Sequence, residues 1–166
     1  MASKTRAYSV SGISSDTAAK VAKVLQERLN TYNDLHLTLK HAHWNVVGPS
    51  FIGVHEMIDP EVDAVRLNAD AVAERIATLG FTPNGTIGAI LKTRAWADYP
   101  VGKGLVPEHL AALDAQYDRV IGENREAIEA VSEDPITEDL LIGQTAALEK
   151  FQWFVRAHLE NGTGRS

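Results

Sequence analysis

The chain has 166 residues, of which 45% are hydrophobic, and its formal net charge is −6 at pH 7. This length and composition suit one compact domain with a hydrophobic core of its own. Cysteine is absent, which excludes disulfides, thiolate metal sites and cysteine nucleophiles. No apolar run approaches the roughly 20 residues of a membrane span, and neither end resembles a signal peptide, so we expect a cytoplasmic protein.

Both ends of the chain are polar and rich in glycine or serine. This composition predicts flexible tails over residues 1–12 and 161–166, with one folded domain over residues 13–160. The tails contain three basic residues, Lys4, Arg6 and Arg165. Affinity for DNA grows with the number of phosphates that basic residues neutralise, so these three make a weak basis for a DNA-binding arm.

Apolar residues recur at intervals of three and four along four long segments, which is the spacing of helices with one buried face. The first two helices are expected over about residues 17–46 and 51–79, on either side of a Gly48-Pro49 turn. Gly80 follows the second helix and is a natural stop. Pro60 lies inside the second helix, where we expect it to bend the helix or remove one hydrogen bond.

A long connection rich in glycine and proline covers residues 80–104, and residues 86–94 within it predict a short helix. The last two long helices are expected over about residues 106–131 and from the Asp134-Pro135 cap to near Glu160. The alternation typical of strands is missing throughout. Two helical hairpins joined by a long crossover predict an all-α, ferritin-like four-helix bundle with a short extra helix in the crossover.

Five residues of metal-binding type are regularly spaced on the second helix and just before it. They are His43, His55, Asp59, Asp70 and Glu74. Two imidazoles and three carboxylates suit iron or another first-row divalent metal. At 100° per residue, the four residues on the helix share one stripe. From spacing alone, an ordinary solvated helix face with a structural histidine is about as good an explanation as a metal site.

One chain cannot gather all five residues around one ion. At a rise of about 1.5 Å per residue, Asp70 lies roughly 22 Å from His55 along the helix. The four helix positions are nevertheless symmetric about the point between Ala64 and Val65. An antiparallel two-fold partner that crossed there would bring the first two residues of one chain opposite the last two of its mate. The spacing therefore predicts two identical sites shared between two subunits.

The segments that carry this pattern resemble a known family. KHAHWNVVG, FIGVHEMIDP, DAVAERIATLG and, near the C-terminus, DLLIGQTAALEKFQWF are similar to the Dps proteins (DNA-binding proteins from starved cells), which are dodecameric mini-ferritins of bacteria. The resemblance runs from about Leu29 to Gly80 and resumes at Asp139. The Glu-x-x-His pair that ordinary ferritins use inside one bundle is missing from the sequence.

The resemblance implies a ferroxidase and iron store that assembles as a homododecamer. Hydrogen peroxide, preferably, or dioxygen would oxidise Fe(II), and ferric mineral would grow inside the hollow shell. The ferroxidase ligands would be His43, His55 and Asp59 of one subunit together with Asp70 and Glu74 of its two-fold mate. The family name also suggests the alternative function of a nucleoid-associated, DNA-compacting protein, and a helical assembly protein with an inactive metal site is a third hypothesis. The few tail cations predict weak or absent DNA binding at neutral pH and physiological salt.

Two further residues are candidates for roles in iron oxidation. Trp44, next to His43, could donate an electron or quench a radical, or it could be a core aromatic. Asp139 matches the position where family members line an acidic three-fold pore for iron entry, or it is an ordinary carboxylate near a helix N-terminus. Glu56 and Glu61 could face the cavity of the shell and seed mineral, but the preferred interpretation is that both are solvated glutamates. The other histidines are interpreted as structural or surface residues: His36, His41, His109 and His158.

Overall fold

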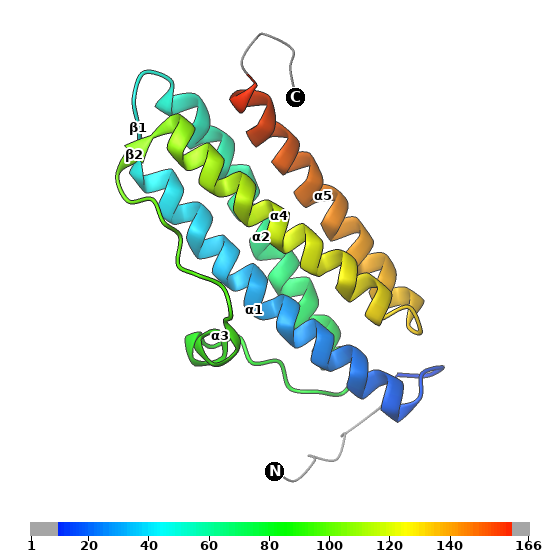
Figure 1. Cartoon of the computed structure of the whole chain (residues 1–166). Helices are drawn as coiled ribbons and strands as arrows, with labels where there is room; N and C mark the ends of the chain where they lie inside the picture. Colours follow the sequence, from blue (N-terminus) through cyan, green and yellow to red (C-terminus); the bar gives the residue numbers. More distant parts are fainter. Residues whose placement is uncertain (1–9, 161–166) are drawn as a thin grey trace.

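A computed structural model describes residues 10–160, which form five helices and two very short strands (Figure 1). The long helices are α1 (Ser15–Asn45), α2 (Phe51–Thr78), α4 (Val106–Ala130) and α5 (Pro135–Leu159). α1 packs mainly against α2, and α4 packs mainly against α5, as two antiparallel hairpins. The short helix α3 (Ile87–Thr93) lies in the crossover, beside α1. The predicted ferritin-like bundle with an extra helix in the crossover is therefore confirmed.

The described residues cover most of the predicted domain and little of the predicted tails. Residues 1–9 and 161–166, which contain all three tail cations, lie outside them. No helix within residues 10–160 is long and apolar enough to cross a lipid bilayer.

Local chemistry sets the ends of the helices. Ser14 is the N-cap of α1, and its Oγ accepts a hydrogen bond from the backbone N–H of Thr17 at 3.1 Å. Gly48, in the turn between α1 and α2, and Gly80, just after α2, have φ angles of 112° and 86°, which side chains rarely allow. Pro60 lies inside α2, and the helix continues through it.

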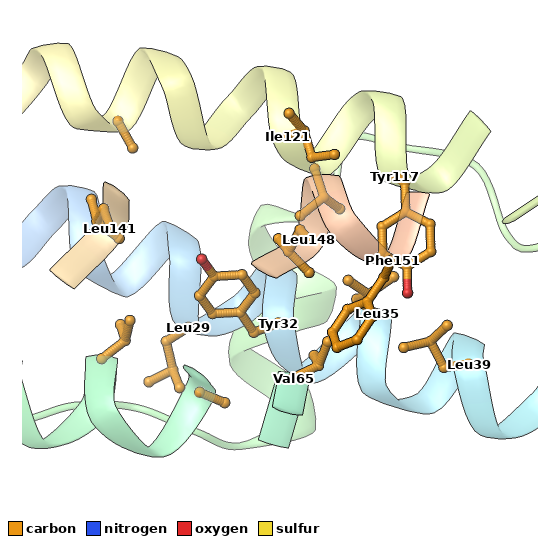
Figure 2. Close-up of a cluster of buried hydrophobic side chains, with 14 of the residues drawn as sticks. Leu29, Tyr32, Leu35, Leu39, Val65, Tyr117, Ile121, Leu141, Leu148 and Phe151 are labelled. Atoms are coloured by element: carbon orange, nitrogen blue, oxygen red, sulfur yellow. The ribbon is translucent and has the colours of Figure 1, made fainter. Parts of the chain in front are cut away.

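The apolar stripes of the four long helices meet in one core (Figure 2). Tyr32 and Leu35 of α1 lie near Val65 of α2, Tyr117 of α4 and Phe151 of α5. The first four of these side chains are fully buried. Val24 of α1 and Ile128 of α4 are only partly buried and pack against the edge of this core.

Glu61 corrects one interpretation of the sequence, because it is buried rather than solvated, with 1% of its surface exposed. It lies three residues after the buried Ile58 and four before the buried Val65, so the helical period places it inward whatever its charge. Its Oε2 accepts a 2.6 Å hydrogen bond from the hydroxyl of Tyr117. Burial raises the pKa of Glu61 to about 7, and the hydrogen bond from Tyr117 opposes this rise.

Two very short strands correct the expectation that strands are missing. β1 (Val46–Val47) and β2 (Gly104–Leu105) pair in parallel, with Val46 opposite Gly104. A Cβ atom at position 104 would lie 2.7 Å from Val101 Cγ1, so any larger residue there would force the Val101 side chain to shift. The pairing fastens the end of the crossover to the turn between α1 and α2.

Candidate metal centre

Two histidines stack against each other where α1 ends and α2 begins. The ring centroids of His43 and His55 are 3.7 Å apart, and the ring planes differ by 22°. The Nδ1 atom of each ring lies 2.9 Å from the backbone carbonyl oxygen of the other residue. Because a carbonyl oxygen only accepts, each neutral ring donates from Nδ1 and leaves the lone pair of Nε2 free. Metal-binding histidines commonly have this arrangement, with one nitrogen bonded to a carbonyl and the other available.

The tight turn between the helices produces this stacking. Gly48 takes the left-handed backbone conformation, and its carbonyl oxygen accepts a hydrogen bond from the N–H of Phe51 at 3.1 Å. The last turn of α1 and the first turns of α2 therefore lie side by side. His43 is buried, with 7% of its surface exposed, and His55 is partly exposed.

Asp59 joins the two histidines from the next turn of α2. Its Oδ1 lies 3.3 Å from His43 Nδ1 and 2.8 Å from the ammonium nitrogen of Lys40. The hydrogen bond from Lys40 lowers the pKa of Asp59, so the carboxylate is ionised at neutral pH. One chain thus brings three of the five predicted residues together: His43, His55 and Asp59.

The other two candidates, Asp70 and Glu74, lie farther along α2, where both are exposed. At about 1.5 Å per residue, Asp70 is roughly 16 Å beyond Asp59 along the helix. Among residues 10–160, no three His, Cys, Asp or Glu side chains are arranged to hold a metal ion. A single chain therefore places only some of the five predicted ligands near one another. The joint role of all five in one metal site remains a prediction.

The predicted ligands on α2 lie in one row along the exposed side of this helix. Val65 is fully buried in its own bundle and Ala64 is partly buried, so a partner would cross on the side of the exposed Asp63 and Leu67. Leu67 is 68% exposed. Asp70 lines a cavity of about 500 Å³ that α1, α2 and the start of the crossover form together. An exposed leucine beside an open cavity suits a face that another chain covers.

Comparisons with known proteins agree with this geometry. The ferritin-like domain family matches residues 22–164. The DNA protection during starvation protein of Mycolicibacterium smegmatis is 59% identical over 159 residues, which cover 95% of this chain and 87% of the relative. The chain belongs to the Dps family. Membership places it among the ferritin-like, iron-storing mini-ferritins.

Solved Dps structures share the whole fold. A Mycobacterium smegmatis Dps structure has a TM-score of 0.93 and 59% identity, covering 96% of this chain and 97% of that one. DpsA14 from Streptomyces coelicolor has a TM-score of 0.94 and 56% identity, covering 99% of this chain and 98% of that one. At these identities the backbone of the Dps bundle is common to all three proteins.

The remaining candidates of this Dps chain lie on its surface. Trp44 is 71% exposed, which rules out the interpretation as a core aromatic, and the Lys40 ammonium lies 5.9 Å from its ring centroid. Asp139 is exposed near the start of α5, and its proposed place in a pore remains a prediction. Glu56 is exposed, as expected.

Sequence reasoning missed Lys40 as part of the cluster. It precedes His43 by three residues on α1 and therefore shares its face, which is the signal that could have found it. His41 and His109 have the structural role expected of them. His41 Nε2 lies 2.9 Å from the carbonyl oxygen of Val101, and Nδ1 of the fully buried His109 lies 3.0 Å from the hydroxyl of Tyr99.

Proposed function

We propose that this Dps protein oxidises Fe(II) at sites shared between two antiparallel subunits and stores the ferric product. Each site would contain His43, His55 and Asp59 of one protomer with Asp70 and Glu74 of its mate. The observation that supports this proposal most strongly is the reciprocal pairing of His43 and His55, which leaves both imidazole Nε2 atoms free, with the ionised carboxylate of Asp59 3.3 Å from Nδ1 of His43. Such a set suits ferrous iron, and the additional carboxylates of the mate favour the harder ferric ion.

Hydrogen peroxide is the oxidant we propose first, with dioxygen as the second. Two Fe(II) ions give one electron each to one peroxide molecule, whose O–O bond breaks. With two protons, the peroxide becomes two water molecules, so no hydroxyl radical is released. Trp44 lies next to His43 and is exposed, and we propose its ring as an electron donor for one-electron oxidants that form nearby.

The proposed function also depends on how the subunits assemble. A homododecamer with two-fold contacts along α2 would close the metal sites and enclose a space for ferric mineral. The exposed apolar side chains on both hairpins, such as Leu67 on α2 and Trp153 on α5, support further contacts between subunits. Asp139 is exposed near the N-terminus of α5, and we propose that it attracts Fe(II) to an entry pore.

Single substitutions test the assignment of the ligands. We expect His43→Ala and Glu74→Ala each to slow Fe(II) oxidation by peroxide at least about tenfold, because losing even an outer-shell partner of a metal ligand commonly costs 10- to 100-fold. Glu56→Ala is the matched control, since Glu56 is also an exposed glutamate of α2 but lies outside the proposed ligand set. Stopped-flow absorbance of the ferric product gives the rates. Assembled variants that retain the wild-type rate would refute the assignment.

A further inference from the structure

Lys40 forms an ion pair with Asp59, the carboxylate of the candidate metal centre. The Nζ atom of Lys40 lies 2.8 Å from Asp59 Oδ1 and donates a hydrogen bond to it. The ion pair joins α1 to α2 across the same junction that the two histidines form. The side chain of Asp59 is 52% exposed, and that of Lys40 is 27% exposed, so both can move without disturbing the core.

The paired carboxylate is not oriented for binding metal together with His43. Its Oδ1 lies 3.3 Å from His43 Nδ1, which is the nitrogen that donates to the carbonyl oxygen of His55. The free lone pair of His43 is on Nε2, on the other side of the ring. Asp59 must therefore turn away from Lys40 before it can share an ion with the imidazoles.

Lys40 also lies near an aromatic ring. Its ammonium lies 5.9 Å from the ring centroid of Trp44, within the range in which an aromatic ring attracts a cation. The four-carbon stem of lysine is flexible, so the ammonium can leave Asp59 and keep this contact. Displacing Lys40 from the carboxylate therefore costs about as much as breaking one partly exposed ion pair.

We propose that Lys40 is an internal cation that neutralises Asp59 in the empty centre and that the incoming metal ion displaces. This inference rests on the proposed function, because it needs the shared site. In the two-fold arrangement, Asp59 faces Asp70 of its mate. Without a cation beside them, these two neighbouring carboxylates would repel each other. Lys40 thus favours the assembled protein without metal and competes with Fe(II) for the carboxylate. It is a positioning residue, which acts through Asp59.

Binding of Fe(II) alone, measured by calorimetry under argon, tests this role. Lys40→Gln should bind Fe(II) about three- to tenfold more tightly than wild type, since the competing ion pair and the nearby positive charge are both gone. Lys40→Arg keeps the charge and should bind no more tightly than wild type. Lys23→Gln, which removes an exposed lysine from the same helix, should stay within about twofold of wild type.

A second measurement separates competition from a merely structural role. Metal-free Lys40→Gln should dissociate into smaller species at a lower urea concentration than wild type, and Fe(II) should remove most of that difference. A lysine that only held α1 to α2 would give weaker or unchanged Fe(II) binding when replaced. Unchanged or weaker binding by Lys40→Gln, with normal binding and oxidation by wild type, overturns the role of Lys40 alone. Failure of the wild-type protein to bind Fe(II) overturns both proposals.

Discussion

Asp134, at the turn between α4 and α5, is one of the buried charges that hold the bundle together. Its Oδ2 lies 2.7 Å from an Nη atom of Arg75 on α2, and both side chains are nearly buried. The Nε of Arg75 donates a second hydrogen bond, to the hydroxyl of Thr137 at 2.9 Å. Burial alone would raise the pKa of Asp134, but hydrogen bonds from Thr137 and Arg75 outweigh it, so the net pKa is lowered.

Replacing this carboxylate should destabilise the protein in a pH-dependent way. We expect Asp134→Asn to lower the free energy of unfolding by about 2–3 kcal/mol at pH 7, because Arg75 is left buried without its partner. The lowered pKa means that the ionised carboxylate contributes fully above about pH 4, the range of an unfolded aspartate, and loses its contribution as the pH falls below that. Urea unfolding at constant protein concentration from pH 7 to pH 3 measures the difference.

Asp98→Asn provides the control for this prediction. Asp98 pairs with Arg94, but its side chain is 89% exposed, so we expect a loss below about 0.5 kcal/mol at every pH. A difference between wild type and Asp134→Asn that stayed constant down to pH 3 would contradict the assigned role of the ionised carboxylate.

At the scale of elements, α2 contains a further symmetric pair. Asp63 and Arg66 are exposed and lie 3.7 Å apart within one chain. They are equally far from the midpoint between Ala64 and Val65, as are the paired metal-ligand positions. An antiparallel partner crossing at that midpoint would therefore place Asp63 opposite Arg66 of the mate.

Charge reversal tests this contact between partner helices. Asp63→Arg would set arginines against arginines, and Arg66→Asp would set aspartates against aspartates, so each should weaken assembly at least about tenfold. The double variant restores opposite charges and should recover most of the loss. Sedimentation across a dilution series measures assembly, with Glu56→Arg as a control on the same helix. A double variant that assembled no better than the single ones would argue against this crossing point.

The sequence predicts the bounds of the long helices within a few residues. The apolar period of three and four, the stop at Gly80 and the start at Pro135 all depend only on nearby residues. The spacing also identifies the row on α2 that is exposed in the structure. The strands β1 and β2 were missed, since two residues show no period. The ion pair between Lys40 and Asp59 was missed as well, because contacts between helices depend on how α1 and α2 pack. Glu61 was interpreted wrongly as solvated, because charged side chains are usually exposed. Its position on the helix nevertheless required it to be buried.

For the whole molecule, the formal charge of −6 sets the expected response to nucleic acid. Phosphates repel an acidic surface, and the three tail cations at positions 4, 6 and 165 neutralise few of them. We therefore expect weak or absent retention of supercoiled plasmid in a gel shift at neutral pH and physiological salt. Retention should appear first when the salt is lowered. A stable complex at physiological salt would instead favour the DNA-compacting alternative.

The central claim is that two subunits share each site, and mixed assemblies test it most directly. His43→Ala and Glu74→Ala chains, refolded together in equal amounts, should form mixed two-fold pairs in which one of two sites contains all five ligands. Random pairing makes about a quarter of all sites complete, so peroxide-driven Fe(II) oxidation should recover to about a quarter of the wild-type level. Preformed assemblies of each variant, merely combined, should not recover. Well-assembled mixed shells without any recovered oxidation would contradict the shared site.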